Sequence, residues 1–134
     1  MNNRRNFMKT SLVASAGIMA AVSTSMACPD QPKNIFAYSK DNEGRWKGKS
    51  GSHAPVIGTE NSKITVETKH GMSERHYIVK HSIITAEGEV LGEHVFTKID
   101  KKAISSYDIK GKHEKLYALS FCNLHDLWVT EFTI

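Results

Sequence analysis

Short segments with β-branched, aromatic and alternating polar residues fill the C-terminal two thirds of the chain. Val, Ile, Thr and Tyr are enriched in six of them, at residues 64–69, 77–86, 90–99, 103–109, 116–122 and 127–134. Their length and composition predict β-strands. Turn residues such as Gly88, Asp100 and Gly111 separate them. No apolar period of 3.6 residues persists beyond residue 57, so helix is a minor component.

The spacing of these segments predicts an all-β fold. Six or more strands that recur every 8 to 12 residues are typical of an antiparallel sandwich. Residues 28–52 differ, because Pro, Asn, Lys, Asp and Gly are frequent there and Phe36, Tyr38 and Trp46 are scattered without a period. We therefore expect an irregular N-terminal arm at 28–52 and a β-sandwich at 53–134.

The first 27 residues have the features of an export signal. Arg4 and Arg5 precede Phe7, residues 11–22 carry no charge, and small residues around Ala27 suit a signal peptidase. The paired arginines indicate the twin-arginine route, so the mature protein is expected in the periplasm or otherwise exported. A retained anchor, or lipidation of Cys28, is the less favoured alternative.

Charge and cysteine content narrow the function classes. The net charge of +4 falls to +1 when the three basic residues of the signal are removed, because no acidic residue leaves with them. Nucleic acid is therefore not an expected partner. In an oxidising compartment Cys28 and Cys122 could form a disulfide. Against this, Cys122 and His125 have the close spacing with which one turn often delivers two metal ligands.

Five side chains suited to a transition metal fall into three local groups. His53 stands alone, His70 is followed by His76, and Cys122 is followed by His125. Imidazole with one thiolate suits iron, copper or zinc better than magnesium or calcium. The other three histidines match no such group, and we expect them to be solvated or hydrogen-bonded: His81, His94 and His113.

These groups resemble the superoxide reductases, which comprise the neelaredoxins and the catalytic domain of the desulfoferrodoxins. The matching segments are His53-Ala54-Pro55-Val56-Ile57, then His70-Gly71-Met72 with Arg75-His76-Tyr77-Ile78, and finally Cys122-Asn123-Leu124-His125 with Leu127-Trp128. The last segment is the most specific. A rubredoxin-like module with four cysteines is absent from the sequence, so the resemblance is to the single-iron type.

The resemblance implies an immunoglobulin-like sandwich of about seven strands with one non-haem iron. Its ligands would be the imidazoles of His53, His70, His76 and His125 and the thiolate of Cys122, with a sixth position open to superoxide. The implied reaction is the one-electron reduction of superoxide to hydrogen peroxide, with an external electron donor that is rubredoxin-like or of another kind. A homo-oligomer, dimer or tetramer, is compatible with this family.

The sequence departs from the family at several places. The family's Glu-Lys before the first histidine is replaced by Gly51-Ser52, so the lysine that attracts superoxide is missing there. Lys47, Lys49 or Lys69 could take that role, because a flexible lysine some residues away can still reach the site, and we favour Lys49. Asp126 stands where glycine is usual, and we expect its carboxylate to point to solvent rather than to an imidazole.

The sequence leaves three less favoured alternatives. One is a purely structural sandwich with a disulfide between Cys28 and Cys122. An exported metal-binding or electron-transfer protein could keep the scaffold without efficient superoxide chemistry. A blue copper centre is disfavoured, because its closing loop usually continues to a methionine and no Met follows Cys122.

Overall fold

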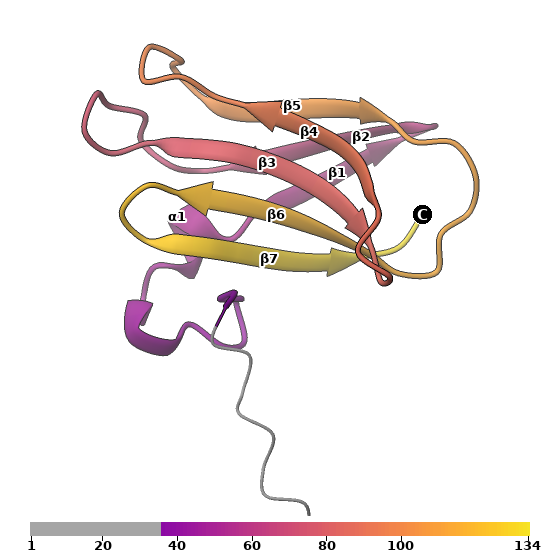
Figure 1. The fold of residues 1–134 in the computed structure, drawn as a ribbon, viewed down its shortest axis with the longest axis horizontal. Helices are drawn as coiled ribbons and strands as arrows, with labels where there is room; N and C mark the ends of the chain where they lie inside the picture. Colours follow the sequence, from indigo (N-terminus) through magenta and orange to yellow (C-terminus); the bar gives the residue numbers. More distant parts are fainter. Residues whose placement is uncertain (1–35) are drawn as a thin grey trace, which may run out of the picture. The chain divides into compact units, whose positions relative to one another are not determined.

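The structure, a computed structural model, describes residues 36–134. It contains seven strands and two short helical segments (Figure 1). These elements are η1 (Gly44–Trp46), α1 (Ser50–His53), β1 (Val56–Glu60), β2 (Lys63–Thr68), β3 (Ile78–Thr85), β4 (Val90–Val95), β5 (Ala103–Asp108), β6 (Leu116–Cys122) and β7 (Asp126–Phe132). The proposed export signal and Cys28 lie outside the described residues.

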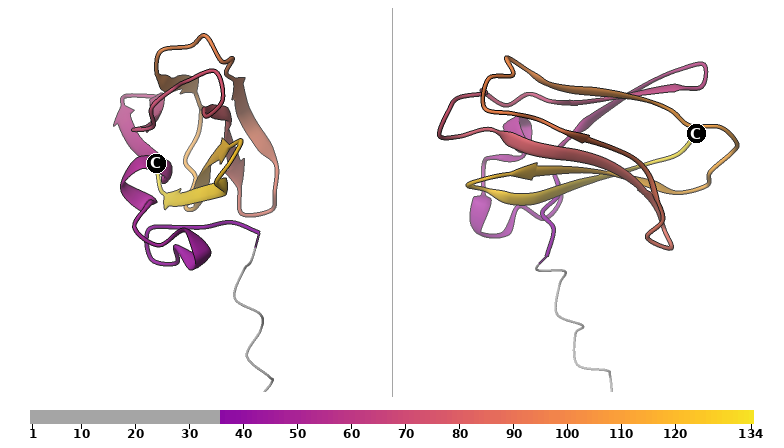
Figure 2. Two further views of the ribbon diagram at one scale, coloured as in Figure 1. Left: turned by 90° about the vertical axis from the view of Figure 1, so that its left-hand side faces the viewer. Right: turned by 45° about the horizontal axis from the view of Figure 1, so that its top comes forward.

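The strands form two antiparallel sheets that face each other (Figure 2). One sheet has the order β1-β2-β5 and the other the order β4-β3-β6-β7. The chain crosses between the sheets after β2, β4 and β5, as it does in immunoglobulin-like sandwiches. The predicted all-β sandwich is confirmed.

Inward-facing residues of both sheets make the core. Ile64 and Val66 of β2 meet Ile83 of β3 and Leu116 and Ala118 of β6, all at most 2% exposed. The alternation of these residues with more exposed neighbours along β2 and β6 is the period-2 pattern of a half-buried strand. A second buried cluster consists of Ile78, Phe96, Ala103 and Cys122. It lies at the end of the sandwich where the predicted ligands are found.

The strand bounds differ from the predicted ones mainly at β1 and β4. Strand β1 was not predicted, because only Val56 and Ile57 are apolar in it and most of its residues are exposed. Strand β4 ends at Val95 and not at residue 99, since Asp100 closes a turn by accepting hydrogen bonds from the amide and hydroxyl of Thr97. Both cases depend on contacts that periodicity does not report.

The arm is mostly irregular over its described part, but it packs on the sandwich. Tyr38 forms a parallel bridge with Trp128 of β7, and its amide donates to the carbonyl of Leu127 at 2.8 Å. Two short helical segments, η1 and α1, interrupt the arm near its end. Within the described residues no helix has the length and apolar character needed to cross a membrane.

Candidate metal centre

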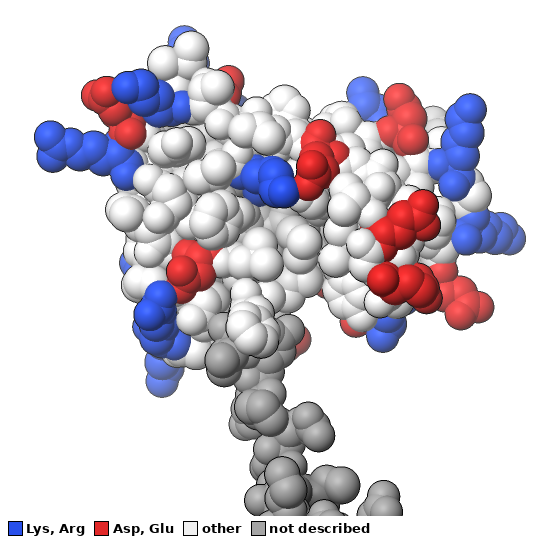
Figure 3. All heavy atoms as spheres, in the orientation of Figure 1, with Lys and Arg blue, Asp and Glu red and all other residues white. Residues whose placement is uncertain are grey.

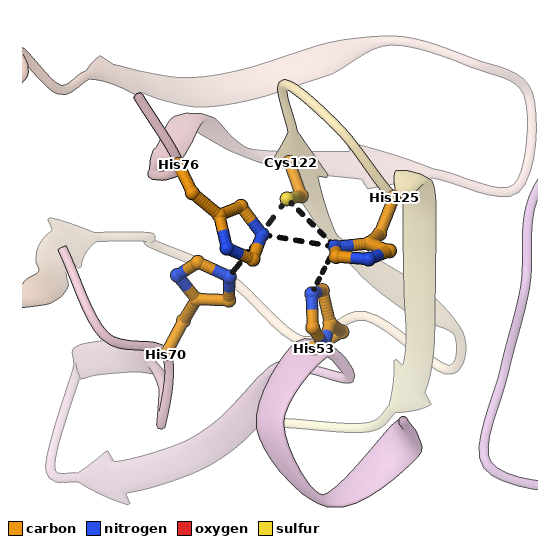
Figure 4. A group of neighbouring side chains, drawn as sticks. All are labelled: His53, His70, His76, Cys122 and His125. Atoms are coloured by element: carbon orange, nitrogen blue, oxygen red, sulfur yellow. Dashed lines mark hydrogen bonds between the residues drawn. The ribbon is translucent and has the colours of Figure 1, made fainter. Parts of the chain in front are cut away.

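The five predicted ligands come together at one end of the sandwich (Figure 4). His53 is the last residue of α1, and His70 and His76 lie in the connection between β2 and β3. Cys122 ends β6, and His125 lies in the turn that leads to β7. One potential ligand atom from each residue lies within 4.8 Å of all the others.

The four imidazoles are arranged in a ring around the centre, each next to two others. Nε2 of His53 is 3.0 Å from Nδ1 of His125, which is 2.9 Å from Nε2 of His76. Nε2 of His76 is in turn 2.9 Å from Nε2 of His70. The rings of His70 and His53, with centroids 4.6 Å apart, complete the order. Three histidines thus present Nε2 and one presents Nδ1.

These distances fit a single metal ion. Imidazole nitrogens bind metals at about 2.1 Å, so two of them at a right angle lie about 3.0 Å apart. The sulfur of Cys122 lies 3.6 Å from Nδ1 of His125 and 3.8 Å from Nε2 of His70. Four imidazoles with one thiolate are a donor set for iron, copper or zinc, and not for a hard cation that prefers oxygen. The residues present therefore fit the implied iron.

Burial prepares these groups to bind a cation. His53 is 3% exposed and His70 is 8% exposed. Burial lowers the pKa of each to about 4, and the neighbouring imidazoles act in the same direction. Burial also raises the pKa of the Cys122 thiol. At neutral pH the two imidazoles are therefore uncharged with a free lone pair, while the thiol becomes a thiolate most readily when a cation binds beside it.

The backbone of α1 fixes the orientation of His53. Its Nδ1 lies 3.1 Å from the carbonyl oxygen of Lys49, which can only accept, so Nδ1 carries the proton. The Ser52 hydroxyl lies 2.8 Å from the same nitrogen. This leaves the lone pair on Nε2, the nitrogen that faces the centre.

Asn123 joins the two loops that carry the remaining ligands. Its side-chain oxygen accepts from the amide of Tyr77 at 3.0 Å, and its side-chain nitrogen donates to the carbonyl of Arg75 at 2.9 Å. The same oxygen is 4.0 Å from the sulfur of Cys122. Asn123 thus fixes the loop of His76 against the turn of His125.

Other side chains differ from the expectations in instructive ways. The carboxylate of Asp126 does not point simply to solvent, because it accepts from the indole of Trp46 and pairs with Arg45. Cys122 is a buried thiol within the ligand cluster, and the Cys28 of the disulfide alternative lies outside the described residues. His81 is buried and hydrogen-bonded, as expected for a histidine outside the site.

Sequence reasoning missed the role of the arm. Trp46 was noted only as a scattered aromatic residue, yet its ring contacts His125 with centroids 4.5 Å apart. Trp128 donates from its indole to the carbonyl of His125 at 2.9 Å and lies beside His53. No local pattern links Trp46 with Asp126, so only the folded chain could reveal this contact.

Three comparisons with known proteins agree with this site. The sequence profile of the family described as desulfoferrodoxin matches residues 43–131. The superoxide reductase of Pyrococcus furiosus is 30% identical over 117 residues, covering 68% of this chain and 93% of the relative. The superoxide reductase of Pyrococcus abyssi is 33% identical over 106 residues, covering 66% of this chain and 90% of the relative.

A solved structure supports the fold independently. It is a superoxide reductase (neelaredoxin) from Ignicoccus hospitalis, and the similarity covers 78% of this chain and 98% of that one with a TM-score of 0.59. Its sequence identity of 22% makes this a likeness of fold alone. The profile match and the two Pyrococcus relatives show that the chain belongs to the desulfoferrodoxin family.

Proposed function

We propose that this protein is a superoxide reductase with one non-haem iron per chain. The observation that carries the proposal is the convergence of four imidazoles and one thiolate, whose ligand atoms all lie within 4.8 Å of one another. The Pyrococcus relatives named superoxide reductase support the same activity. The residues that would hold the iron are His53, His70, His76, Cys122 and His125.

The chain's own groups prepare the reaction. A ferrous ion in this site would supply the one electron that, with two protons, converts superoxide to hydrogen peroxide. His53 and His70 stay uncharged and oriented because they are buried, and Cys122 contributes the negative charge that suits a cation. An external donor, rubredoxin-like or of another kind, must return the electron for the next turnover.

Lys49 is proposed as the group that attracts the superoxide anion. It precedes α1, the helical turn that ends in His53. Burial is the main reason that the pKa of His125 is lowered, and the charge of Lys49 acts in the same direction. The same charge acts on the thiol of Cys122 and on His53. Its ammonium group is therefore within electrostatic reach of the ligand set, as the proposed role requires.

Absorption and metal analysis of protein expressed with iron test the proposal. We expect one iron per chain and a visible thiolate-to-ferric charge-transfer band that bleaches with ascorbate. The band should be lost in Cys122→Ser and kept in Cys28→Ser, the matched control. Zinc, copper or no metal after iron loading would contradict the assignment. An iron site that does not accelerate the loss of superoxide would leave a metal-binding or electron-transfer protein.

Two further properties of the mature protein are proposed. We propose that residues 1–27 direct export by the twin-arginine route and are removed, which leaves the arm from residue 28 and the sandwich from residue 53. Their support is the sequence pattern alone. Mass spectrometry of the periplasmic protein would show an N-terminus at Cys28, or the added mass of a lipid on that residue.

We also propose that the chain assembles with copies of itself through the outer face of the sheet β4-β3-β6-β7. Several apolar side chains of this sheet are exposed, and Val90, Val95 and Phe121 are 40% or more exposed. The side of the molecule seen in Figure 3 has most of its charged groups near its two ends. One ion pair on the sheet, Lys80 with Glu93, could also pair with a second copy about a two-fold axis.

A further inference from the structure

Three side chains from opposite parts of the chain form a closed cluster beside the metal centre. The carboxylate of Asp126 accepts from the indole of Trp46 at 3.0 Å and pairs with the guanidinium of Arg45 at 2.5 Å. The same guanidinium lies over the Trp46 ring, 4.8 Å from its centroid. We call these three residues the arm lock, because they join η1 of the arm to the first residue of β7.

The arm lock touches a metal ligand at two points. The ring of Trp46 meets the ring of His125 edge to face, at a centroid distance of 4.5 Å and an angle of 84°. Asp126 directly follows His125 in the chain. The carbonyl of His125 also accepts from the indole of Trp128. The backbone and the ring of this ligand are thus both constrained by tryptophans.

The backbone at Asp126 supports a specific role for its carboxylate. Its φ is 62°, in the left-handed region that glycine adopts readily and in which Asp and Asn are tolerated better than most other residues. Glycine would therefore satisfy the turn without strain. The carboxylate adds what glycine cannot supply, which is an acceptor for both Arg45 and Trp46.

A second carboxylate ties the other end of the same segment to α1. Glu43 accepts from the amide of Gly48 at 2.7 Å and from the amide of Ser50 at 2.9 Å. Since α1 ends in His53, residues 43–50 form a strap from the turn of His125 to the helix of His53. The facing ring nitrogens of these two ligands are 3.0 Å apart, so the strap spans one edge of the ligand set.

We propose that Asp126 is a positioning residue that acts through Trp46 to hold the ring of His125 in its metal-binding orientation. This rests on the proposed function, because it assumes that His125 binds the metal. Loss of the lock should free the ring to rotate away, so that the metal leaves faster. Residues that orient a ligand from behind typically affect metal affinity about 10- to 100-fold.

Cobalt(II) is a suitable probe, since its visible absorption reports ligand geometry without any superoxide chemistry. The full chain is loaded with cobalt, and its release to excess EDTA is followed for wild type, Asp126→Gly and Trp46→Phe. Asp126→Gly removes the acceptor while the backbone conformation stays favourable, and Trp46→Phe keeps a ring but removes the N–H. We expect about 10-fold faster release from both variants and an altered cobalt spectrum.

Two controls separate positioning from general loss of stability. Glu131→Gln in β7 breaks a similarly exposed ion pair with Lys115, and this variant should release cobalt at the wild-type rate. Gly92→Ala in β4 should also release cobalt at the wild-type rate, although its added Cβ would clash with the Tyr107 ring and destabilise the sandwich. Equal acceleration by Gly92→Ala, or wild-type release and spectra in both lock variants, would overturn the role of Asp126. A wild type that binds no cobalt at all would instead remove the proposed metal centre, and the positioning role with it.

Discussion

Lys49 is the residue proposed to attract the anionic substrate. Its position before α1 separates it by four residues from His53, and its backbone carbonyl already accepts from the ring of that ligand. The main chain of Lys49 is therefore held beside the metal centre.

We expect Lys49→Ala to slow the reaction of the reduced protein with superoxide roughly 2- to 10-fold at low ionic strength, because one attracting charge is lost. The rate should also depend less on salt. Rapid mixing at several ionic strengths measures both. Lys63→Ala removes an equal charge from the opposite end of β2 and should leave the rate and its salt dependence nearly unchanged. Identical behaviour of the two variants would exclude the proposed role.

His81 is the buried titratable residue that the metal centre does not use. The Thr68 hydroxyl donates its hydrogen to Ser120, so its oxygen accepts from Nε2 of His81, and the Ser105 hydroxyl lies 2.9 Å from Nδ1. A neutral imidazole with one donor and one acceptor satisfies this network. Burial, with a smaller effect of His94, lowers the pKa of His81 to about 4.

This pKa predicts how stability depends on pH. The unfolded chain binds a proton at His81 near pH 6.5 and the folded chain only near pH 4, so stability is fully present above pH 6.5 and falls as the pH drops toward 4. Between about pH 7.5 and 5 the loss from this residue is about 2 kcal/mol. Urea unfolding of metal-free wild type and His81→Gln measures it as a difference. Equal pH dependence of the two proteins would contradict the prediction.

At the scale of single elements, β4 contains a glycine with no room for a side chain. A Cβ at Gly92 would lie 2.4 Å from Cδ1 of Tyr107, a ring carbon in β5 of the facing sheet. Gly58 in β1 is different, since a Cβ there would meet only Thr65 at 3.9 Å. The two sheets can therefore approach each other closely near β4 only because Gly92 has no side chain. Gly58, in contrast, has room for one.

We expect Gly92→Ala to lower the free energy of unfolding by about 1–3 kcal/mol, because the Tyr107 ring must shift to admit the methyl group. Gly58→Ala should be neutral or slightly stabilising, since it places a side chain in a strand without a clash. Urea midpoints of the two variants give the comparison. A similar midpoint for both would mean that the sheets separate more easily than the structure indicates.

At the scale of the whole molecule, the outer face of β4-β3-β6-β7 carries the proposed self-association. Ser82, Ile84, Leu119, Phe121 and Leu127 are among the residues that line a shallow groove of about 260 Å³ on it. An antiparallel sheet often turns a polar face to water, so exposed apolar side chains around the Lys80–Glu93 ion pair are consistent with the proposed interface.

We expect Leu119→Lys to shift the protein toward monomers, because a buried unpaired charge opposes association. Val56→Lys, at an exposed apolar position of β1 in the other sheet, should leave the assembly intact. Sedimentation velocity at several protein concentrations measures the shift. A monomeric wild type, or an oligomer that Leu119→Lys does not affect, would refute this interface.

The sequence by itself determined the sandwich and the candidate ligands. In strands such as β2 and β6, buried residues alternate with more exposed ones. This alternation identifies the side that faces the core in any fold that buries one face of each strand. The order and spacing of the five candidate ligands match those of a known family. Without that match, no local property of the sequence would distinguish the four histidine ligands from His81. The five candidate ligands are His53, His70, His76, Cys122 and His125.

Only the tertiary structure decided how these residues are arranged and supported. The order of the imidazoles, the use of Nδ1 by His125, and the arm lock all depend on segments that are distant in sequence, such as Trp46 and Asp126, which are 80 residues apart. Strand β1 likewise depends on its pairing with β2, because its own sequence has few apolar residues and does not predict a strand. Local patterns report which face of a segment is apolar, whereas contacts between segments are fixed by packing of the whole chain.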